Sequence, residues 1–230
     1  MKENEEVREI VKTGDNFEVK TDKGIYPART VIIASGKKSR LLNVPGEAEF
    51  KNRGLTYCAT CDAPLFQDKI VAVIGAGNSG LDAVIQLIKI AQHIYLINVS
   101  GELTGDPVMQ EQVKSSNLVT VLNNAQVTSI TGNKFVTGIE VKRNNLTEKL
   151  AVQGVFVEVG LIPNSEFAKE IAQNQYQEIK VNSRNETNVP GIFAAGDVTD
   201  VPEKQIIIAA GEGAKASLSA FRYLIQHSLS

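Results

Sequence analysis

The sequence contains no tryptophan, and it has only two histidines and two cysteines among its 230 residues. It also lacks any run of about 18 apolar residues, the length that a membrane-spanning helix requires. The chain opens with the polar stretch Met-Lys-Glu-Asn-Glu-Glu rather than with a secretory signal. We therefore expect neither a membrane span nor export, and we predict a cytoplasmic location.

Clusters of basic residues are lacking as well. The chain has 24 Lys and Arg against 26 Asp and Glu, which gives a formal net charge of −2. Because nucleic acids are bound by clustered Lys and Arg that neutralise phosphates, we do not expect a nucleic acid as partner. The length is sufficient for two small domains, each with its own core, and this is the organisation that we predict.

The two cysteines, Cys58 and Cys61, have the spacing C-x-x-C. In a reducing compartment this spacing indicates a redox-active or metal-binding pair rather than a structural bridge. A four-ligand zinc site would need both His93 and His227, which lie far away and outside any zinc spacing. We therefore favour a redox-active dithiol over zinc and over inert thiols, and we expect no metal site.

Asp62 directly follows the second cysteine. A carboxyl at this position could carry the proton that a thiol and its thiolate exchange during a redox cycle. The alternative is a surface acid in the turn before Pro64. Both interpretations stay open on this evidence.

A glycine-rich turn follows the dithiol, between the predicted strand 69–74 and a helix predicted from about residue 78 to 91. A second strand at 94–99 completes a βαβ unit of about 30 residues, the context that a dinucleotide fingerprint requires. There, the glycines would permit a tight turn, close approach of a pyrophosphate, and close packing of helix and strand. This context disfavours a chance glycine turn. The candidate cofactor-binding residues are Gly75, Gly77, Asn78, Ser79 and Gly80.

The end of the second strand normally distinguishes NAD from NADP. It holds Asn98, where an acidic residue would be expected for the adenosine ribose of NAD, although an amide can still bind a hydroxyl. A 2′-phosphate would favour Lys or Arg, and residues 90–113 contain neither. The charged side chains in this stretch are acidic, and they are Glu102, Asp106 and Glu111. The sequence thus favours NADH over NADPH.

Short strands separated by turns predict two antiparallel meanders, within residues 7–26 and 127–150. Each is followed by a buried strand that ends in glycine, at 30–34 and 155–159. The two halves look like a duplication of one dinucleotide-binding plan. Breaker clusters, which we interpret as crossings between two domains, stand at 43–46 and 160–163.

A third motif lies near the end of the chain. A strand predicted at 191–195 runs into Gly196 and Asp197, and Lys204, Gln205 and Ile206 then open a long helix predicted to residue 226. The carboxylate would lie beside a bound ligand, and the helix start would direct N–H groups at negative charge. A flavin fits, with Asp197 on its ribityl hydroxyls, and a carrier between nicotinamide and disulfide is needed chemically. The alternative is a buried strand and a packing helix.

Several motifs together resemble the low-molecular-weight thioredoxin reductase family: residues 57–62, 75–80, 160–164 and 191–197, and Lys204-Gln205. The tail 204–221 is most similar to the flavoprotein subunits of alkyl hydroperoxide reductases within that family. The resemblance implies an α/β fold with two Rossmann-like domains. The FAD-binding domain would comprise residues 1–43 and 160–230, and the inserted NAD(P)-binding domain would comprise residues 44–159.

The resemblance further implies a path for electrons from NAD(P)H to FAD, to the dithiol, and on to the disulfide of a thioredoxin-like or peroxiredoxin-linked protein. In this family Cys61 would face the flavin, Cys58 would attack the partner, and Asp62 would be the acid. A large domain rotation would present the dithiol and the nicotinamide to the flavin in turn. The cofactor-binding residues outside the glycine turn would be Asn98, Gly160, Gly196, Asp197, Lys204, Gln205 and Ile206.

The sequence departs from this family at two places. NADPH-type members carry His-Arg-Arg after the second strand, where Asn98-Val99-Ser100 stands here. The N-terminal third, which bears the family's first glycine fingerprint, has no counterpart. The strands at 30–35 and 191–195 would then be the outer part of an FAD-domain sheet whose remaining strands are missing, which leaves an exposed sheet edge. We therefore expect a truncated or split form with an incomplete FAD site, and either a homodimer or completion by another chain through this exposed sheet edge.

Two other functions are compatible with parts of the sequence. A non-catalytic nucleotide-binding or assembly component would keep the nicotinamide fold and use the exposed edge to dock a partner. A ferredoxin-NADP reductase variant would share the fold. Enzymes of that second kind lack the dithiol, so Cys58 and Cys61 argue against it.

Overall fold

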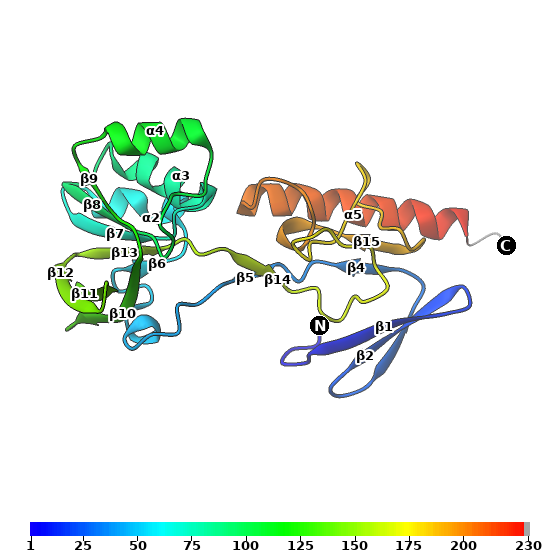
Figure 1. Cartoon of the computed structure of the whole chain (residues 1–230). Coiled ribbons are helices and arrows are strands. Elements are labelled where there is room, and N and C mark those ends of the chain that lie inside the picture. Colours follow the sequence, from blue (N-terminus) through cyan, green and yellow to red (C-terminus); the bar gives the residue numbers. More distant parts are fainter. Residues whose placement is uncertain (228–230) are drawn as a thin grey trace. The chain divides into compact units, whose positions relative to one another are not determined.

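The computed structural model describes residues 1–227, and the chain divides into two compact units. Unit 1 comprises residues 1–38 and the chain from residue 161 onward, whereas unit 2 comprises residues 39–160. Each unit is therefore described by itself (Figure 1). The first crossing lies at 38/39, ahead of the breaker cluster where the sequence suggested it.

Unit 2 is built on a parallel sheet of five strands in the order β6-β13-β7-β8-β9. The strands are β6 (Leu55–Thr56), β13 (Gly154–Val157), β7 (Ile70–Ile74), β8 (His93–Ile97) and β9 (Val119–Leu122). The chain moves outward from β7 through β8 and β9, then returns to the other side of β7 as β13. The strand order therefore reverses between β7 and β13, the position where open α/β sheets bind ligands.

Both faces of this sheet are covered, which is why β7 and β13 are almost continuously apolar. Val71 and Val73 pack toward α3 (Asn78–Leu87) and α4 (Pro107–Ser115), whereas Ala72 and Ile74 belong to the core on the opposite face. This alternation is the two-residue period of a strand. The opposite face is covered by a three-stranded antiparallel sheet (Figure 1), whose strands are β10 (Ala125–Gly132), β11 (Val136–Arg143) and β12 (Leu146–Ala151).

Short helical segments complete unit 2. They are α1 (Glu47–Phe50), α2 (Ala59–Asp62) and the 3-10 turn η1 (Ala63–Phe66). Phe50 of α1 lies in the core beneath β10–β12, and Phe66 of η1 packs edge-on against Phe156 of β13 with ring centroids 4.8 Å apart. The segment that carries the dithiol is thereby anchored to the sheet on its C-terminal side.

Unit 1 begins with an antiparallel meander of three strands, β1 (Val7–Thr13), β2 (Asn16–Thr21) and β3 (Ile25–Ala28). β4 (Val31–Ile33) pairs in parallel with β15 (Ile192–Ala194), and β5 (Lys37–Ser39) pairs with β14 (Leu161–Pro163). The turn η2 (Gly196–Val198) and the helix α5 (Ile206–Gln226) follow β15. One core gathers around Phe17, Ile33 and Ile179, and a smaller one joins Phe193 of β15 to Ala216 and Ala220 of α5.

The predicted α/β fold, both meanders and the βαβ unit are confirmed. The helix expected to reach residue 91 ends at Leu87 and continues as a turn in which Ala91 N donates to Leu87 O at 2.8 Å. Helices α1, α2 and α4 were not predicted. Among residues 1–227, no helix combines the length and the apolar character that crossing a bilayer requires.

Candidate functional site

The candidate site of unit 2 lies where three neighbouring parallel strands end. β6 leads into Cys58, β13 leads into Glu158, and β7 leads into Gly75. Because β13 lies between β6 and β7 in register, its end separates the other two. The sheet order therefore places a carboxylate between the dithiol and the glycine turn.

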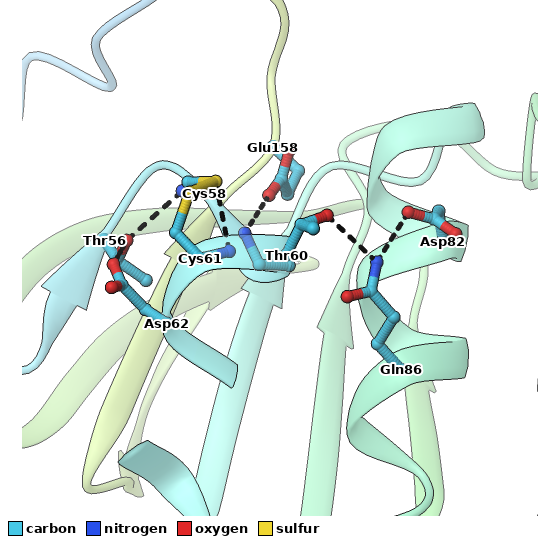
Figure 2. The surroundings of a disulfide bond; sticks show 9 residues. Thr56, Cys58, Thr60, Cys61, Asp62, Asp82, Gln86 and Glu158 are labelled. Carbon is cyan, nitrogen blue, oxygen red and sulfur yellow. Dashed lines mark hydrogen bonds between the residues drawn. A yellow bond between two sulfur atoms is a disulfide. The ribbon is translucent and has the colours of Figure 1, made fainter. Parts of the chain in front are cut away.

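The two cysteines form a disulfide across the first turn of α2. Cys58 is the N-cap of this helix, the Cα atoms of Cys58 and Cys61 are 5.3 Å apart, and Cys61 N donates a hydrogen bond to Cys58 Sγ at 3.2 Å. Figure 2 shows the pair at the start of the helix. The C-x-x-C spacing thus closes one helical turn, which holds both sulfur atoms at the edge of the sheet.

Asp62 is connected to the dithiol through Thr56, the last residue of β6. The Thr56 hydroxyl donates to the Asp62 carboxylate and accepts a hydrogen bond from Cys58 N at 3.2 Å (Figure 2). Thr56 is buried, and a buried hydroxyl group requires hydrogen-bond partners. The Asp62 carboxylate and Cys58 N–H are these partners. The Asp62 carboxylate is consequently fixed beside the dithiol turn.

Glu158 is a functional candidate that was not predicted from the sequence. Its Oε1 accepts a hydrogen bond from Ala59 N, the first peptide group of α2, at 3.3 Å (Figure 2). Burial raises the pKa of the Glu158 carboxyl to about 7; the Ala59 hydrogen bond opposes this, and the charge of Asp82 adds to it. No motif marks Glu158, but its place directly after a buried parallel strand was a signal, since ligands bind at such strand ends.

A second connection ties the dithiol helix to α3. Gln86 Nε2 donates to Asp82 Oδ2 at 2.7 Å and to Thr60 Oγ1 at 3.4 Å (Figure 2). Thr60 lies in α2, whereas Gln86 and Asp82 lie on α3. The dithiol helix is therefore held from two sides, by Glu158, which directly follows β13, and by α3, which follows the glycine turn.

The glycine turn has the geometry that a dinucleotide needs. Gly75 has a φ of 111°, and a Cβ added to it would lie 2.3 Å from Glu158 O. A Cβ on Gly80 would lie 1.8 Å from Gly75 O, so α3 can approach β7 only without a side chain there. Gly77, the N-cap of α3, has open space above it, because its nearest neighbour would be Thr104 Oγ1 at 3.9 Å.

These features fit a bound diphosphate. The first turn of α3, which includes Asn78 and Ser79, contains no acidic residue. Its free N–H groups and the open backbone at Gly77 form the anion-binding start of a helix. Asn78 Oδ1 accepts from Asp106 N at 2.7 Å, which fixes the loop before α4 beside the turn.

The position of Asn98 after β8 suggested that its amide would bind a ribose hydroxyl, but in the structure the amide is hydrogen-bonded within the protein. It is 4% exposed, and its Nδ2 donates to Glu102 O and to Asn123 Oδ1, both at 2.9 Å. Its Oδ1 accepts from Ser100 N at 3.2 Å. Asn98 therefore shapes the loop after β8, and a bond from its amide to a ribose hydroxyl would compete with these contacts.

The remaining predicted residues lie outside unit 2, apart from Gly160 at its end. Gly196 and Asp197 form η2 after β15, and Gln205 is the N-cap of α5. Within residues 1–227, no hydrogen bond or ion pair uses the Asp197 carboxylate. Ile206 at the helix start is 89% exposed. The Asp197 carboxylate can accept hydrogen bonds from hydroxyl groups, and apolar side chains are exposed at the start of α5. Both features fit a bound flavin.

Lys204 closes the loop ahead of α5. Its Nζ donates to Thr199 O at 2.6 Å and to Val201 O, and it forms an ion pair with Glu178 at 3.3 Å. Lys37 pairs with the same carboxylate. Burial lowers the pKa of Lys204 and the charge of Lys37 acts in the same direction, whereas Glu178 opposes the shift. Lys204 thus holds the backbone that leads into Gln205.

The structure brings one group of predicted residues together in unit 2: Cys58, Cys61, Asp62, Gly75, Gly77, Asn78, Ser79 and Gly80. Gly196, Asp197, Lys204, Gln205 and Ile206 form a second group in unit 1. Across the described chain, residues 1–227, no group of three or more His, Cys, Asp and Glu side chains is arranged to hold a metal ion.

Two of the curated proteins that are similar to this chain illustrate the match. A protein of Staphylococcus aureus (strain MRSA252), named as a subunit of alkyl hydroperoxide reductase, is 44% identical over 223 residues, which are 95% of this chain and 44% of that protein. A protein of Bacillus subtilis (strain 168) named NADH dehydrogenase is 47% identical over 217 residues, 93% of this chain and 43% of that protein. The chain thus spans less than half the length of these relatives.

Among solved structures, thioredoxin reductase from Streptococcus pyogenes MGAS5005 matches with a TM-score of 0.89 and 32% identity, over 96% of this chain and 73% of that one. The sequence profile of the pyridine nucleotide-disulphide oxidoreductases matches residues 1–213. The sequence profile and the solved structure each match nearly the whole chain. The predicted resemblance to thioredoxin reductases is therefore confirmed. The chain belongs to the pyridine nucleotide-disulphide oxidoreductase family.

Proposed function

We propose that this chain forms the dithiol-bearing and nicotinamide-binding part of a flavoprotein disulfide reductase of the thioredoxin reductase type. Electrons would pass from NAD(P)H to FAD, to the Cys58–Cys61 pair, and to a partner disulfide. The observation that carries the proposal is the shared edge of the unit 2 sheet, where the dithiol turn and a dinucleotide-type glycine turn follow neighbouring strand ends. Bound nicotinamide would supply hydride, and bound flavin would relay the electron pair to sulfur.

We infer the cofactor-binding residues of unit 2 from the geometry of the glycine turn, which would accommodate a diphosphate. The backbone from Gly75 to Gly80 would hold the diphosphate, with Asn78 and Ser79 contributing N–H groups at the start of α3. NADH is favoured over NADPH, because residues 90–113 contain no Lys or Arg for a 2′-phosphate. The loop that Asn98 organises would lie at the adenosine ribose.

Thiol exchange would use the dithiol in two steps. The reduced pair attacks through the Cys58 thiolate, which forms a mixed disulfide with one sulfur of the partner and releases the other as a thiol. Cys61 then attacks Cys58, so that the internal disulfide returns and the partner leaves fully reduced. Re-reduction of the pair takes two electrons and two protons, and Asp62, whose carboxylate accepts a hydrogen bond from the Thr56 hydroxyl, would pass a proton to and from a thiol.

The partner would be a thioredoxin-like or peroxiredoxin-linked protein with a disulfide. Support comes from the similar proteins, one named as a subunit of alkyl hydroperoxide reductase and one as a thioredoxin reductase. A dithiol that must be re-reduced in each cycle suits a reducing compartment, so we place the protein in the cytoplasm.

The flavin residues of unit 1 would be Asp197, Gln205 and Ile206, with Gly196 and Lys204 shaping the loop, and with Gly160 at the crossing. We infer that this flavin site is incomplete in the isolated chain. Within the described residues the parallel sheet of unit 1 has two strands, and α5 leaves apolar side chains at its start exposed. A second copy of the chain or another polypeptide would complete it.

The test is a binding and reduction experiment on the purified chain. We expect NADH to bind while FAD stays substoichiometric, and we expect disulfide reduction only after a completing polypeptide is added. Cys58→Ser and Cys61→Ser should each abolish that reduction, with NADH binding unchanged. Stoichiometric FAD and NADH-driven turnover by the chain alone would contradict the incomplete site. Turnover retained in either serine variant would remove the dithiol from the mechanism.

A further inference from the structure

Glu158 brings a carboxylate to the start of the dithiol helix. A cysteine at the N-cap of a helix normally gains from the N–H groups of the first turn, which favour the thiolate. Here Cys61 N–H donates to Cys58 Sγ at 3.2 Å, whereas the first of these groups, Ala59 N–H, is bonded to the Glu158 carboxylate at 3.3 Å. The carboxylate therefore places a negative charge at the start of α2, and this charge opposes the stabilisation that the N–H groups of the first turn give to a thiolate.

The charges around this position do not offset that of Glu158. The charge of Asp82 on α3 acts on Glu158, and Asp62 lies in the single turn of α2, so both neighbouring elements carry acids. Among residues 1–227 no ion pair involves Glu158. A negative charge close to a partly buried carboxylate disfavours the ionised form of that carboxylate.

We propose that Glu158 is a positioning residue for the dithiol, which fixes the start of α2 and keeps the reduced Cys58 as the thiol rather than the thiolate near neutral pH. When Cys58 does lose its proton, the carboxylate next to Ala59 becomes the favoured place to hold one. Glu158 thus sets how reactive the attacking sulfur is. The inference rests on the proposed function in one respect, that Cys58–Cys61 is a redox pair that can be reduced.

The experiment measures the reactivity of Cys58 without any cofactor. The full chain is reduced, freed of reductant, and alkylated with uncharged iodoacetamide between about pH 5 and 9, with Cys58 and Cys61 distinguished by tandem mass spectrometry. Glu158→Gln keeps an oxygen acceptor for Ala59 N–H and removes the charge. We expect Cys58 in this variant to react about 3 to 10 times faster than wild type near pH 7.5. Below about pH 6 the two rates should converge, because the carboxyl is then neutral.

Further variants separate charge from packing. Glu158→Asp keeps the charge and should retain a slow, wild-type-like pH profile, provided that circular dichroism shows the fold intact. Glu148→Gln, on the exposed strand β12, removes one charge from unit 2 at a distance and should leave the profile unchanged. An unshifted profile in Glu158→Gln, or an equal shift in Glu148→Gln, would overturn the inference while leaving the disulfide reductase function standing. A disulfide that resists reduction altogether would overturn both.

Discussion

At the scale of single residues, Glu158 makes the stability of unit 2 depend on pH. Burial raises the pKa of this carboxyl from 4.5 to about 7, so the folded state binds the proton more tightly than the unfolded state does. The protonated form therefore stabilises the fold, and this contribution is lost as the pH rises from 4.5 through 7. The penalty for the ionised form is about 1 to 3 kcal/mol.

We expect Glu158→Gln to lose less stability than wild type between about pH 5 and 8. Scanning calorimetry of the oxidised chain at both pH values checks this. Glu148→Gln is the matched control, because its carboxylate is exposed on β12. If the unfolding free energies of wild type and Glu158→Gln changed equally with pH, ionisation of the Glu158 carboxyl would not destabilise the fold.

Residues whose function depends on local spacing were predictable. The cysteine pair is three positions apart, and the three glycines lie within six residues of one chain segment. Glu158 could not be found in the same way, because its partner Ala59 lies 99 positions away. The role of Asn98 was obscured for a related reason, since Asn123 is 25 positions distant and reaches it only through the adjacent strand β9. Contacts between neighbouring strands are set by sheet order, which a local motif does not contain.

At the scale of elements, the contact between β7 and α3 depends on Gly80. Its added Cβ would lie 1.8 Å from Gly75 O, which is backbone and cannot move without opening the turn. We expect Gly80→Ala to lower the unfolding free energy by about 2 to 3 kcal/mol and to abolish NADH binding. Thermal unfolding and nucleotide titration measure the two effects.

Gly77→Ala provides the comparison within the same turn. Its Cβ would approach only Thr104 Oγ1, at 3.9 Å, and its φ of −82° suits alanine. The variant should therefore fold with nearly wild-type stability and bind NADH at least about tenfold more weakly, because the methyl group occupies the approach of the diphosphate. Wild-type affinity in Gly77→Ala would place the cofactor elsewhere.

Elements with a strong period were predicted, and those without one were not. The strands of both meanders show alternation or buried apolar runs, and α5 has an apolar pattern over 21 residues. Helix α4 has a start signal, Asp106 followed by Pro107, and the Asp106 side chain accepts from Val108 N at 2.8 Å. The one buried residue of α4 is Val113, so the start signal was not followed by a periodic apolar pattern that would have predicted a helix. The dithiol helix α2, with four residues, is too short to show a period.

At the scale of the whole molecule, α5 carries an apolar stripe on the side away from its core contacts. Ala216 and Ala220 pack against β15, while exposed residues recur at alternating steps of four and three positions. They are Ile207, Gly211, Ala214, Leu218, Phe221 and Ile225. Phe221 is 61% and Ile207 77% exposed. A stripe with this spacing is typical of a helix that packs against another element.

We expect this stripe to drive association of the chain in solution. Light scattering coupled to size-exclusion chromatography should show a mass that rises with protein concentration. Leu218→Glu combined with Phe221→Glu should give a monomer, because two charges would then be buried without partners in the interface. The matched control is Leu146→Glu on β12 of unit 2, a residue that is 75% exposed but has no stripe around it, and it should associate like wild type. A wild-type chain that stays monomeric at high concentration would contradict self-association through this stripe.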